Sequence, residues 1–323
     1  MMMRTLLLTP DLLPQAVDLW NRALGAHFPM RPALLKANLW EEPNFDAEGS
    51  RTVLKGDRLV GFIALKRRTA PMGNLPADQK GWISALVVDP EFQGQGVGTG
   101  LLRDALAHLR QFSTEPVGIG SDPGHFFPGI PLECRQALDW FARRGAELGG
   151  LSCDLVSHEI AAYTHPEAAL QAFRRSPSVM YRPMEDGEQE AVLAFMRQEF
   201  PGRWAWEMEQ HLSRGGNLED VMLALDEGQV VGFARIHTPR SRRFGPGIYW
   251  APLFPGAHGG LGPIGVGAAQ RGRGIGLGLL SASIAELRNR GVESAVIDWT
   301  GLIRFYGIVG FRPWKWYVMA SFK

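Results

Sequence analysis

Two stretches of the chain share one order of apolar and polar positions. Each begins with a short apolar run, at 85–88 and again at 264–266, which a glycine-rich turn follows. After each turn, apolar residues recur every three to four positions, at 101–109 and at 280–287. Because that spacing predicts a helix and a short apolar run predicts a buried strand, each stretch reads as strand, turn, helix and strand. Such a crossover pairs its two strands in parallel.

The similarity extends to the flanking segments, which makes the chain an internal repeat. Three motifs return in the same order: LVGFIAL at 59–65 as VVGFARI at 230–236, QGQGVG at 93–98 as RGRGIG at 271–276, and WFARRG at 140–145 as FYGIVG at 305–310. A short polar turn precedes each copy of the first motif, which predicts an antiparallel hairpin. A duplicated unit with insertions in its loops explains why the three motifs keep their order while the distance between their copies varies.

The boundary between the copies is placed where the pattern turns polar. Residues 151–158 read as the last strand of the first copy, and residues 180–183 open the second. Between them, a short helix begins near Pro166 and ends at the polar run 174–178. We therefore predict an N-terminal domain at 1–160, a linker at 161–177 and a C-terminal domain at 178–323. Both belong to the α/β (α+β) class.

Composition and charge exclude several functions. Lys plus Arg is 34 and Asp plus Glu is 33, so the chain has almost no excess positive charge that would favour binding to nucleic acid. Two cysteines, no His-Glu-x-x-His and no Gly-x-Ser-x-Gly leave zinc-site and serine-hydrolase readings without support. The beginning of the sequence lacks the apolar core of a signal peptide, and no apolar run reaches the length of a membrane span. We expect a cytoplasmic protein without a metal.

The glycine turns are candidate anion sites, because backbone N–H groups gather where such a turn opens a helix. Neither turn has the Gly-Lys-Ser/Thr of a P-loop, and neither fits Gly-x-Gly-x-x-Gly. The spacing that both share is Gln/Arg-x-x-Gly-x-Gly, at 93, 96 and 98 and at 271, 274 and 276.

This spacing, with the hairpin before it and the aromatic-glycine helix after it, resembles the GNAT superfamily of acyl-CoA-dependent N-acetyltransferases. The resemblance covers most of each copy. It implies two tandem GNAT-like domains, each a mixed, mostly antiparallel sheet with a central parallel crossover, flanked by helices. Mycothiol synthases share this tandem arrangement, although the local sequence does not look like theirs. Acetyl-CoA is the implied co-substrate.

The resemblance also implies which residues bind acetyl-CoA. The pantetheine arm would lie along the strand residues Leu86, Val87 and Val88 in the first copy and Ile264, Gly265 and Val266 in the second. The pyrophosphate would lie in the turns formed by Gly94, Gln95, Gly96, Val97, Gly98 and Thr99 and by Gly272, Arg273, Gly274, Ile275, Gly276 and Leu277. Arg273 adds a charge that Gln95 lacks.

For catalysis, the resemblance points to the second copy. Tyr306 occupies the position of the family's tyrosine, which protonates the departing thiolate, whereas Phe141 stands there in the first copy and cannot donate a proton. Asp298 is the candidate general base, acting through water. Glu199 and Glu207 are alternative acceptor-site carboxylates.

The expected activity is acetyl transfer from acetyl-CoA to the amine of a small-molecule or peptide acceptor, with the chemistry in the C-terminal domain. The alternative is a non-catalytic protein that binds or senses acyl-CoA. We expect a monomer or homodimer with no nucleic-acid or membrane partner.

Overall fold

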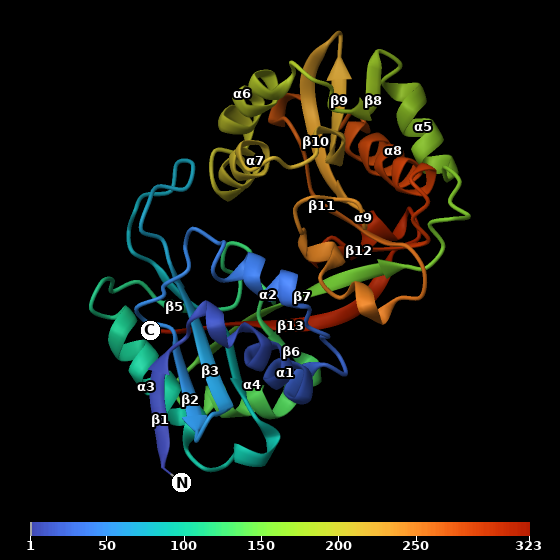
Figure 1. Cartoon of the computed structure of the whole chain (residues 1–323). Helices are drawn as coiled ribbons and strands as arrows, with labels where there is room; N and C mark the ends of the chain where they lie inside the picture. Colours follow the sequence, from blue (N-terminus) through green and yellow to red (C-terminus); the bar gives the residue numbers. More distant parts are fainter. Residues whose placement is uncertain (1) are drawn as a thin grey trace. The chain divides into compact units, whose positions relative to one another are not determined.

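The computed structural model describes residues 2–323, which form two compact units (Figure 1). The first unit comprises residues up to Pro71, residues 77–152 and residues 315–323; the second comprises 72–76 and 153–314. The duplication inferred from the sequence therefore corresponds to two folded units. Each is a mixed α/β unit, as predicted.

The first unit is built on β1 to β5, with the short β6 and parts of β7 and β13. The bounds are β1 (Met3–Leu7), β2 (Arg51–Lys55), β3 (Arg58–Arg67), β4 (Gly81–Val88), β5 (Val117–Ile119), β6 (Ile130–Pro131), β7 (Glu147–Ser157) and β13 (Arg312–Phe322). Its strand order is β1-β2-β3-β4-β5-β13. Only β4 and β5 are parallel among the pairs β1 to β5, as the crossover predicts.

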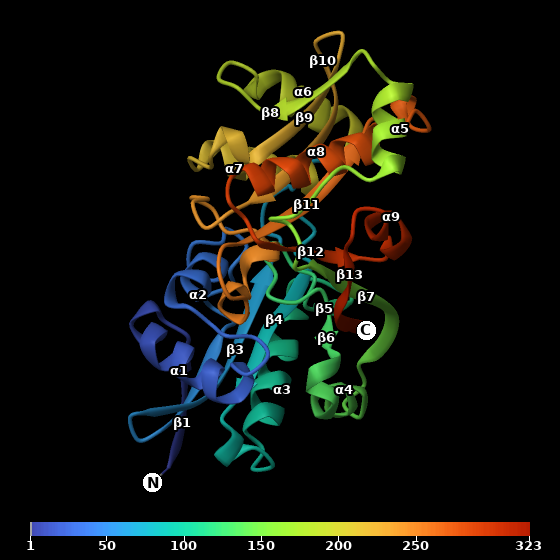
Figure 2. The ribbon, with the colours of Figure 1, turned by 90° about the vertical axis from the view of Figure 1, so that its right-hand side faces the viewer.

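Helices cover both faces of this sheet (Figure 2). The four helices are α1 (Leu13–Leu24), α2 (Pro32–Asn38), α3 (Val97–Leu109) and α4 (Arg135–Ala142). α3 carries Leu101 and Leu102 into a buried apolar cluster that also contains Val60, Phe141 and Phe322. The leucines whose spacing predicted this helix therefore lie on the face that packs on the sheet.

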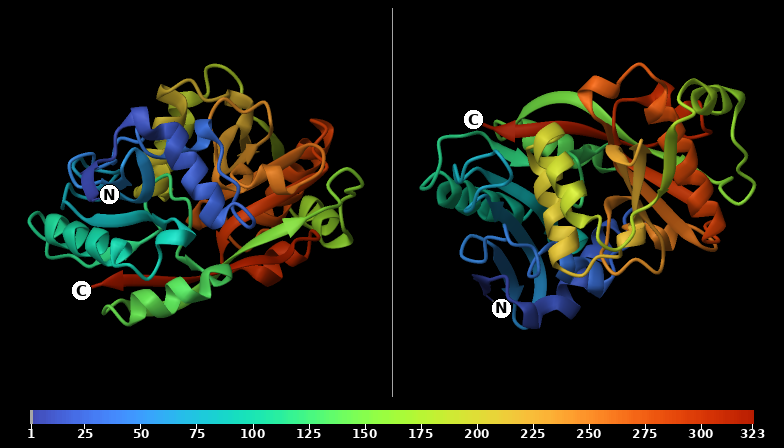
Figure 3. Two further views of the ribbon diagram at one scale, coloured as in Figure 1. Left: turned by 60° about the horizontal axis from the view of Figure 1, so that its bottom comes forward. Right: turned by 90° about the horizontal axis from the view of Figure 1, so that it is seen from above.

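The second unit repeats this plan with the strand order β7-β12-β11-β10-β9-β8. Its own strands are β8 (Val179–Pro183), β9 (Val221–Asp226), β10 (Gln229–His237), β11 (His258–Val266) and β12 (Ser294–Thr300), and its helices are α5 (Glu167–Arg175), α6 (Gln189–Glu199), α7 (Arg203–Ser213), α8 (Ile275–Asn289) and α9 (Ile303–Gly307). β11 and β12 form the parallel pair. Helices α6 and α7 cover one face and α5 and α8 the other (Figure 3). Gly291 follows α8 at φ 80°, the left-handed conformation that commonly ends a helix.

The division into units differs from the predicted domains 1–160 and 178–323. β13, the last strand, pairs with β5 and β6 in the first unit, and the second half of β7 pairs with β12 in the second. The predicted linker 161–177 contains α5, which packs on α8. The difference arises because a strand pattern shows that a segment is extended, but not which open sheet edge supplies its hydrogen-bond partners.

Candidate active site

The two glycine turns have the same backbone conformation. Gly96 and Gly274 cap the N-termini of α3 and α8 with φ of 85° and 88°, and Gly94 and Gly272 have φ of 73° and 82°. Residues with a Cβ rarely adopt these positive angles, so the conformation itself favours glycine at all four positions.

Both turns present unused backbone donors. Within residues 2–323, the N–H groups of 94–98 and of 272–276 have no hydrogen-bond acceptor. The first residue of each motif braces its turn in the same way: Gln93 Nε2 donates to Val88 O at 3.1 Å, and Arg271 Nε donates to Val266 O at 3.3 Å. Free N–H groups at a helix N-terminus attract an anion, so each turn can hold a phosphate.

The surroundings of the two turns differ in two respects. Arg273 Nη1 donates to Asp226 Oδ2 at 2.7 Å, so its charge is paired rather than left for an anion. Hydrogen bonds from Ser178 and then Arg273 lower the pKa of Asp226. In addition, a Cβ on Gly274 would lie 3.2 Å from Ala172 of α5, whereas a Cβ on Gly96 would meet nothing within 4 Å. A substitution at Gly274 would therefore disturb α5 as well as any ligand.

Beside each turn, the two parallel strands separate. The pairing of β11 with β12 ends at Gly260 and Val296, and that of β4 with β5 ends at Ile83 and Ile119. Beyond these points the predicted pantetheine strands keep a partner on one side only. Those residues are Leu86, Val87 and Val88, which pair with β3, and Ile264, Gly265 and Val266, which pair with β10. An open strand edge at such a split can pair with an extended ligand.

In the second unit, the structure brings the two predicted catalytic residues together near this split. Asp298, on β12, faces β11: its Oδ1 lies 3.4 Å from the position that a Cβ on Gly262 would take. Tyr306, on α9, is buried. Burial and, second, the charge of Asp298 raise the pKa of Tyr306 to about 12. The phenol therefore stays protonated at neutral pH and can serve as a proton donor.

The corresponding region of the first unit holds a closed ion pair. Lys66 Nζ lies 2.7 Å from Asp122 Oδ2, both side chains are fully buried, and Ser84 Oγ donates to the same oxygen at 2.7 Å. Burial acts to raise the pKa of Asp122, but the charge and hydrogen bond of Lys66, with smaller contributions from His125 and Ser84, together outweigh it and the pKa is lowered. Phe141 lies in the apolar core, 6.3 Å from the ring of Phe322. Phe141, which corresponds to Tyr306 in the second unit, thus has no proton to donate.

Of the alternative carboxylates, Glu199 is the last residue of α6, and its side chain binds the second glycine turn's approach. Its Oε2 accepts the N–H of Ala268 at 2.7 Å, directly before the second glycine turn. Glu207 forms an ion pair with Arg203 at 2.5 Å. The buried pair of Lys66 and Asp122 was not predicted from the sequence. A lysine within an apolar strand is the signal that could have revealed it, because buried lysines require a partner.

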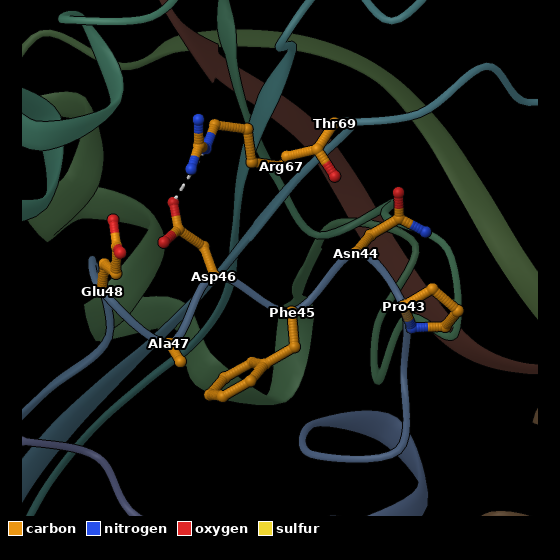
Figure 4. A pocket seen from close by; sticks show the side chains of 8 residues that line it. All are labelled: Pro43, Asn44, Phe45, Asp46, Ala47, Glu48, Arg67 and Thr69. Atoms are coloured by element: carbon orange, nitrogen blue, oxygen red, sulfur yellow. Dashed lines mark hydrogen bonds and ion pairs between the residues drawn. The ribbon is translucent and has the colours of Figure 1, made fainter.

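A pocket in the first unit lies outside this site. This pocket, of about 230 Å³, is lined by residues 43–48, Arg67 and Thr69. Two of its charged groups are paired, since Asp46 Oδ2 accepts from Arg67 at 3.1 Å and lies 2.9 Å from His108 (Figure 4). Across residues 2–323, no group of three or more metal-ligating side chains was found. Among the same residues, no helix has the length and apolar character needed to cross a membrane.

In each unit, crossover strands separate beside a glycine turn with free backbone N–H groups, the arrangement that the resemblance to acyl-CoA-dependent transferases implies. The model of the acetyltransferase (GNAT) family matches residues 13–120 and 187–311. The chain therefore belongs to the GNAT acetyltransferase family and is an acetyltransferase.

A curated relative is similar to this chain over most of both lengths. A mycothiol acetyltransferase from Thermobispora bispora is 28% identical over 291 residues, which cover 84% of this chain and 83% of the relative. The likeness to that enzyme is thus broader than the local motifs indicated.

Solved structures share the two-unit architecture. The glucosamine N-acetyltransferase region of a fungal multi-domain GH3 β-N-acetylglucosaminidase is 25% identical with a TM-score of 0.88; the match covers 99% of this chain and 38% of that one. The chain therefore spans less than half the length of that protein. A tandem GNAT protein from the clavulanic acid biosynthesis pathway is 15% identical with a TM-score of 0.68, covers 99% of this chain and 98% of its own, and is similar in fold.

Proposed function

We propose that this acetyltransferase moves an acetyl group from acetyl-CoA to the amine of an amino sugar, and that the second unit performs the chemistry. The single observation that carries the proposal is that Asp298, close enough to raise the pKa of Tyr306, faces Gly262 of β11 in the unit whose glycine turn has free N–H groups. The amino sugar is inferred from the glucosamine named for the solved relative with TM-score 0.88.

The turn at 272–276 would bind the pyrophosphate, and the open edge at 264–266 would bind the pantetheine arm. A strand N–H would polarise the thioester carbonyl. The neutral amine attacks that carbonyl carbon, so a C–N bond forms and the C–S bond breaks. Asp298, through water, takes the proton that the amine loses. Tyr306 gives its proton to the departing thiolate, which suits a phenol that remains protonated at neutral pH.

A role in binding without chemistry is favoured for the first unit. Its turn offers the same free N–H groups at 94–98, but Lys66 neutralises Asp122 and Phe141 is part of the core. The alternative of a protein that binds acyl-CoA without chemistry therefore applies to the first unit alone.

The proposal is tested by detecting the thiol of released CoA when the full chain is mixed with acetyl-CoA and a panel of amines. With glucosamine as the amine, the wild type should release CoA from acetyl-CoA, and Tyr306→Phe should suppress this release. No release with any amine would contradict the proposal.

A further inference from the structure

A buried arginine lies near the split in the second unit. Arg235 is on β10, opposite Gly262 and Pro263, because Ala234 pairs with Ile264 and Ile236 with Leu261. Its side chain faces α7: Arg235 Nη2 donates to His211 Nδ1 at 3.0 Å and to His237 Nε2 at 3.2 Å. Only 9% of the surface of Arg235 is exposed to solvent.

The two histidines orient this guanidinium without adding charge. Burial and the charge of Arg235 lower the pKa of His211 to about 3 and the pKa of His237 well below its usual value. Both rings are therefore neutral at pH 7. His211 Nε2 donates to Asn217 O at 2.9 Å, which leaves Nδ1 as the acceptor for Arg235. The guanidinium is thus held in one orientation by neutral acceptors.

Arg235 lacks a bonded counter-ion, unlike the neighbouring arginines. Burial lowers the pKa of Arg235, whereas the charges of Glu207 and Asp220 act to raise it. Each carboxylate is nevertheless paired with another arginine: Glu207 with Arg203 at 2.5 Å, and Asp220 with Arg290 at 3.1 Å. In the described chain, no carboxylate oxygen lies within 4 Å of Arg235, and its buried Nε has no acceptor. Burying such a cation is costly unless a ligand completes its hydrogen bonds.

One face of α7 connects this arginine with the candidate catalytic residues. Arg203, Glu207 and His211 are spaced four residues apart and therefore share one face, which extends about 12 Å at 1.5 Å per residue. His211 contacts Arg235 at one end of the face, and at the other end Arg203 lies 5.3 Å from the ring of Trp299, which directly follows Asp298. Across the sheet the separation is shorter, because Gly262 lies opposite Arg235 on β11 and a Cβ on Gly262 would lie 3.4 Å from Asp298 Oδ1.

We propose that Arg235 binds an anionic oxygen group, a carboxylate or a phosphate, carried by the acceptor whose amine is acetylated near Asp298. The inference rests on the proposed function and deepens it: the acceptor is an anionic amino sugar rather than a neutral one. Arg235 is then the residue that determines acceptor specificity.

The test compares three acceptors with the full chain: glucosamine, glucosamine 6-phosphate and muramic acid. The last two carry a phosphate and a carboxylate, so they distinguish the two sources of negative charge. We expect kcat/KM for at least one of them to exceed that for glucosamine by about 10- to 100-fold, as for a charge-assisted hydrogen bond, with the difference mainly in KM. Equal kcat/KM for all three would overturn the proposal.

Variants then assign the preference to Arg235. Arg235→Gln should bring the anionic-to-neutral ratio to about one, and Arg235→Lys, which keeps the charge but cannot contact both histidines in the same way, should retain part of it. Arg174→Gln, at an exposed arginine of α5, should leave the ratio unchanged. An unchanged ratio in Arg235→Gln would contradict the proposal. If Arg235→Gln does not fold, the ratio in Arg235→Lys decides, and a wild-type value there overturns the assignment.

Binding separates this inference from the proposed function. Thermal unfolding is measured with glucosamine 6-phosphate and with muramic acid, without acetyl-CoA. Stabilisation of the wild type and its loss in the Arg235 variant would support the anion site even if no amine were acetylated. Acetylation of glucosamine with no effect of either anionic sugar would support the function and overturn the anion site.

Discussion

Lys66 Nζ lies 2.7 Å from Asp122 Oδ2, and this fully buried ion pair lies where β4 and β5 separate. Five residues after the shared Val-Gly-Phe glycine, the first copy has Lys66 and the second has His237. His237 is neutral at pH 7, because burial lowers its pKa. A lysine therefore neutralises the carboxylate of the first unit, and no lysine is placed at the equivalent position near Asp298. The difference in charge favours chemistry in the second unit.

Removing this lysine should destabilise the protein strongly. Lys66→Met leaves Asp122 buried without its partner, so the free energy of unfolding should fall by about 3–5 kcal/mol. Lys36→Met removes an exposed lysine that pairs with Glu41 and should cost no more than about 1 kcal/mol. Denaturant unfolding measures both. Adding Asp122→Leu to Lys66→Met should restore most of the loss; similar losses for Lys66→Met and Lys36→Met would contradict this account.

The phenol of Tyr306 should matter for turnover and not for binding. Tyr306→Phe should lower kcat by about 10²- to 10⁴-fold with nearly unchanged affinity for acetyl-CoA, because only proton delivery is lost. Tyr181→Phe is the matched control, since it removes a buried hydroxyl without a hydrogen-bond partner from the same unit. Single-turnover kinetics and calorimetry provide the two readouts. Full activity in Tyr306→Phe would exclude Tyr306 as the general acid.

His211 should make the protein less stable in acid. Its pKa is about 3 in the folded protein against an ordinary value of 6.5, so the unfolded chain binds the proton first. The stabilisation is therefore complete above pH 6.5 and is lost progressively as the pH falls from 6.5 toward 3. His211→Asn should weaken this pH dependence of the unfolding midpoint. His27→Asn, at an exposed histidine, should not; the same slope in wild type and His211→Asn would refute the prediction.

Much of the fold follows from repeated local patterns. The spacing of Leu101 and Leu102, and of Leu280 and Ile284, predicted helices whose apolar faces are buried in the structure. The shared turn spacing predicted two equivalent helix N-termini, and Gly96 and Gly274 have nearly the same φ. These features depend on neighbours in the sequence, which is why they could be predicted.

The exchanged strands and the charge networks could not be predicted, because they depend on distant partners. β13 pairs with β5, and part of β7 pairs with β12, although the pattern of each strand is equally compatible with its own copy. Likewise, the partner of Arg273 is Asp226, 47 residues earlier in the chain. The sequence indicated a charge beside the anion site, but not that an aspartate would pair with it.

The most direct test of the central claim compares one substitution in both turns. Gly276 and Gly98 suit it, because a Cβ there would meet its nearest neighbours only at 3.6 Å and 3.4 Å, and neither glycine has a positive φ. Each glutamate would add a negative charge beside the free N–H groups of its turn. In a CoA-release assay with acetyl-CoA and an accepted amine, Gly276→Glu should abolish activity and Gly98→Glu should retain it. Retained activity in Gly276→Glu with its loss in Gly98→Glu would contradict catalysis in the second unit.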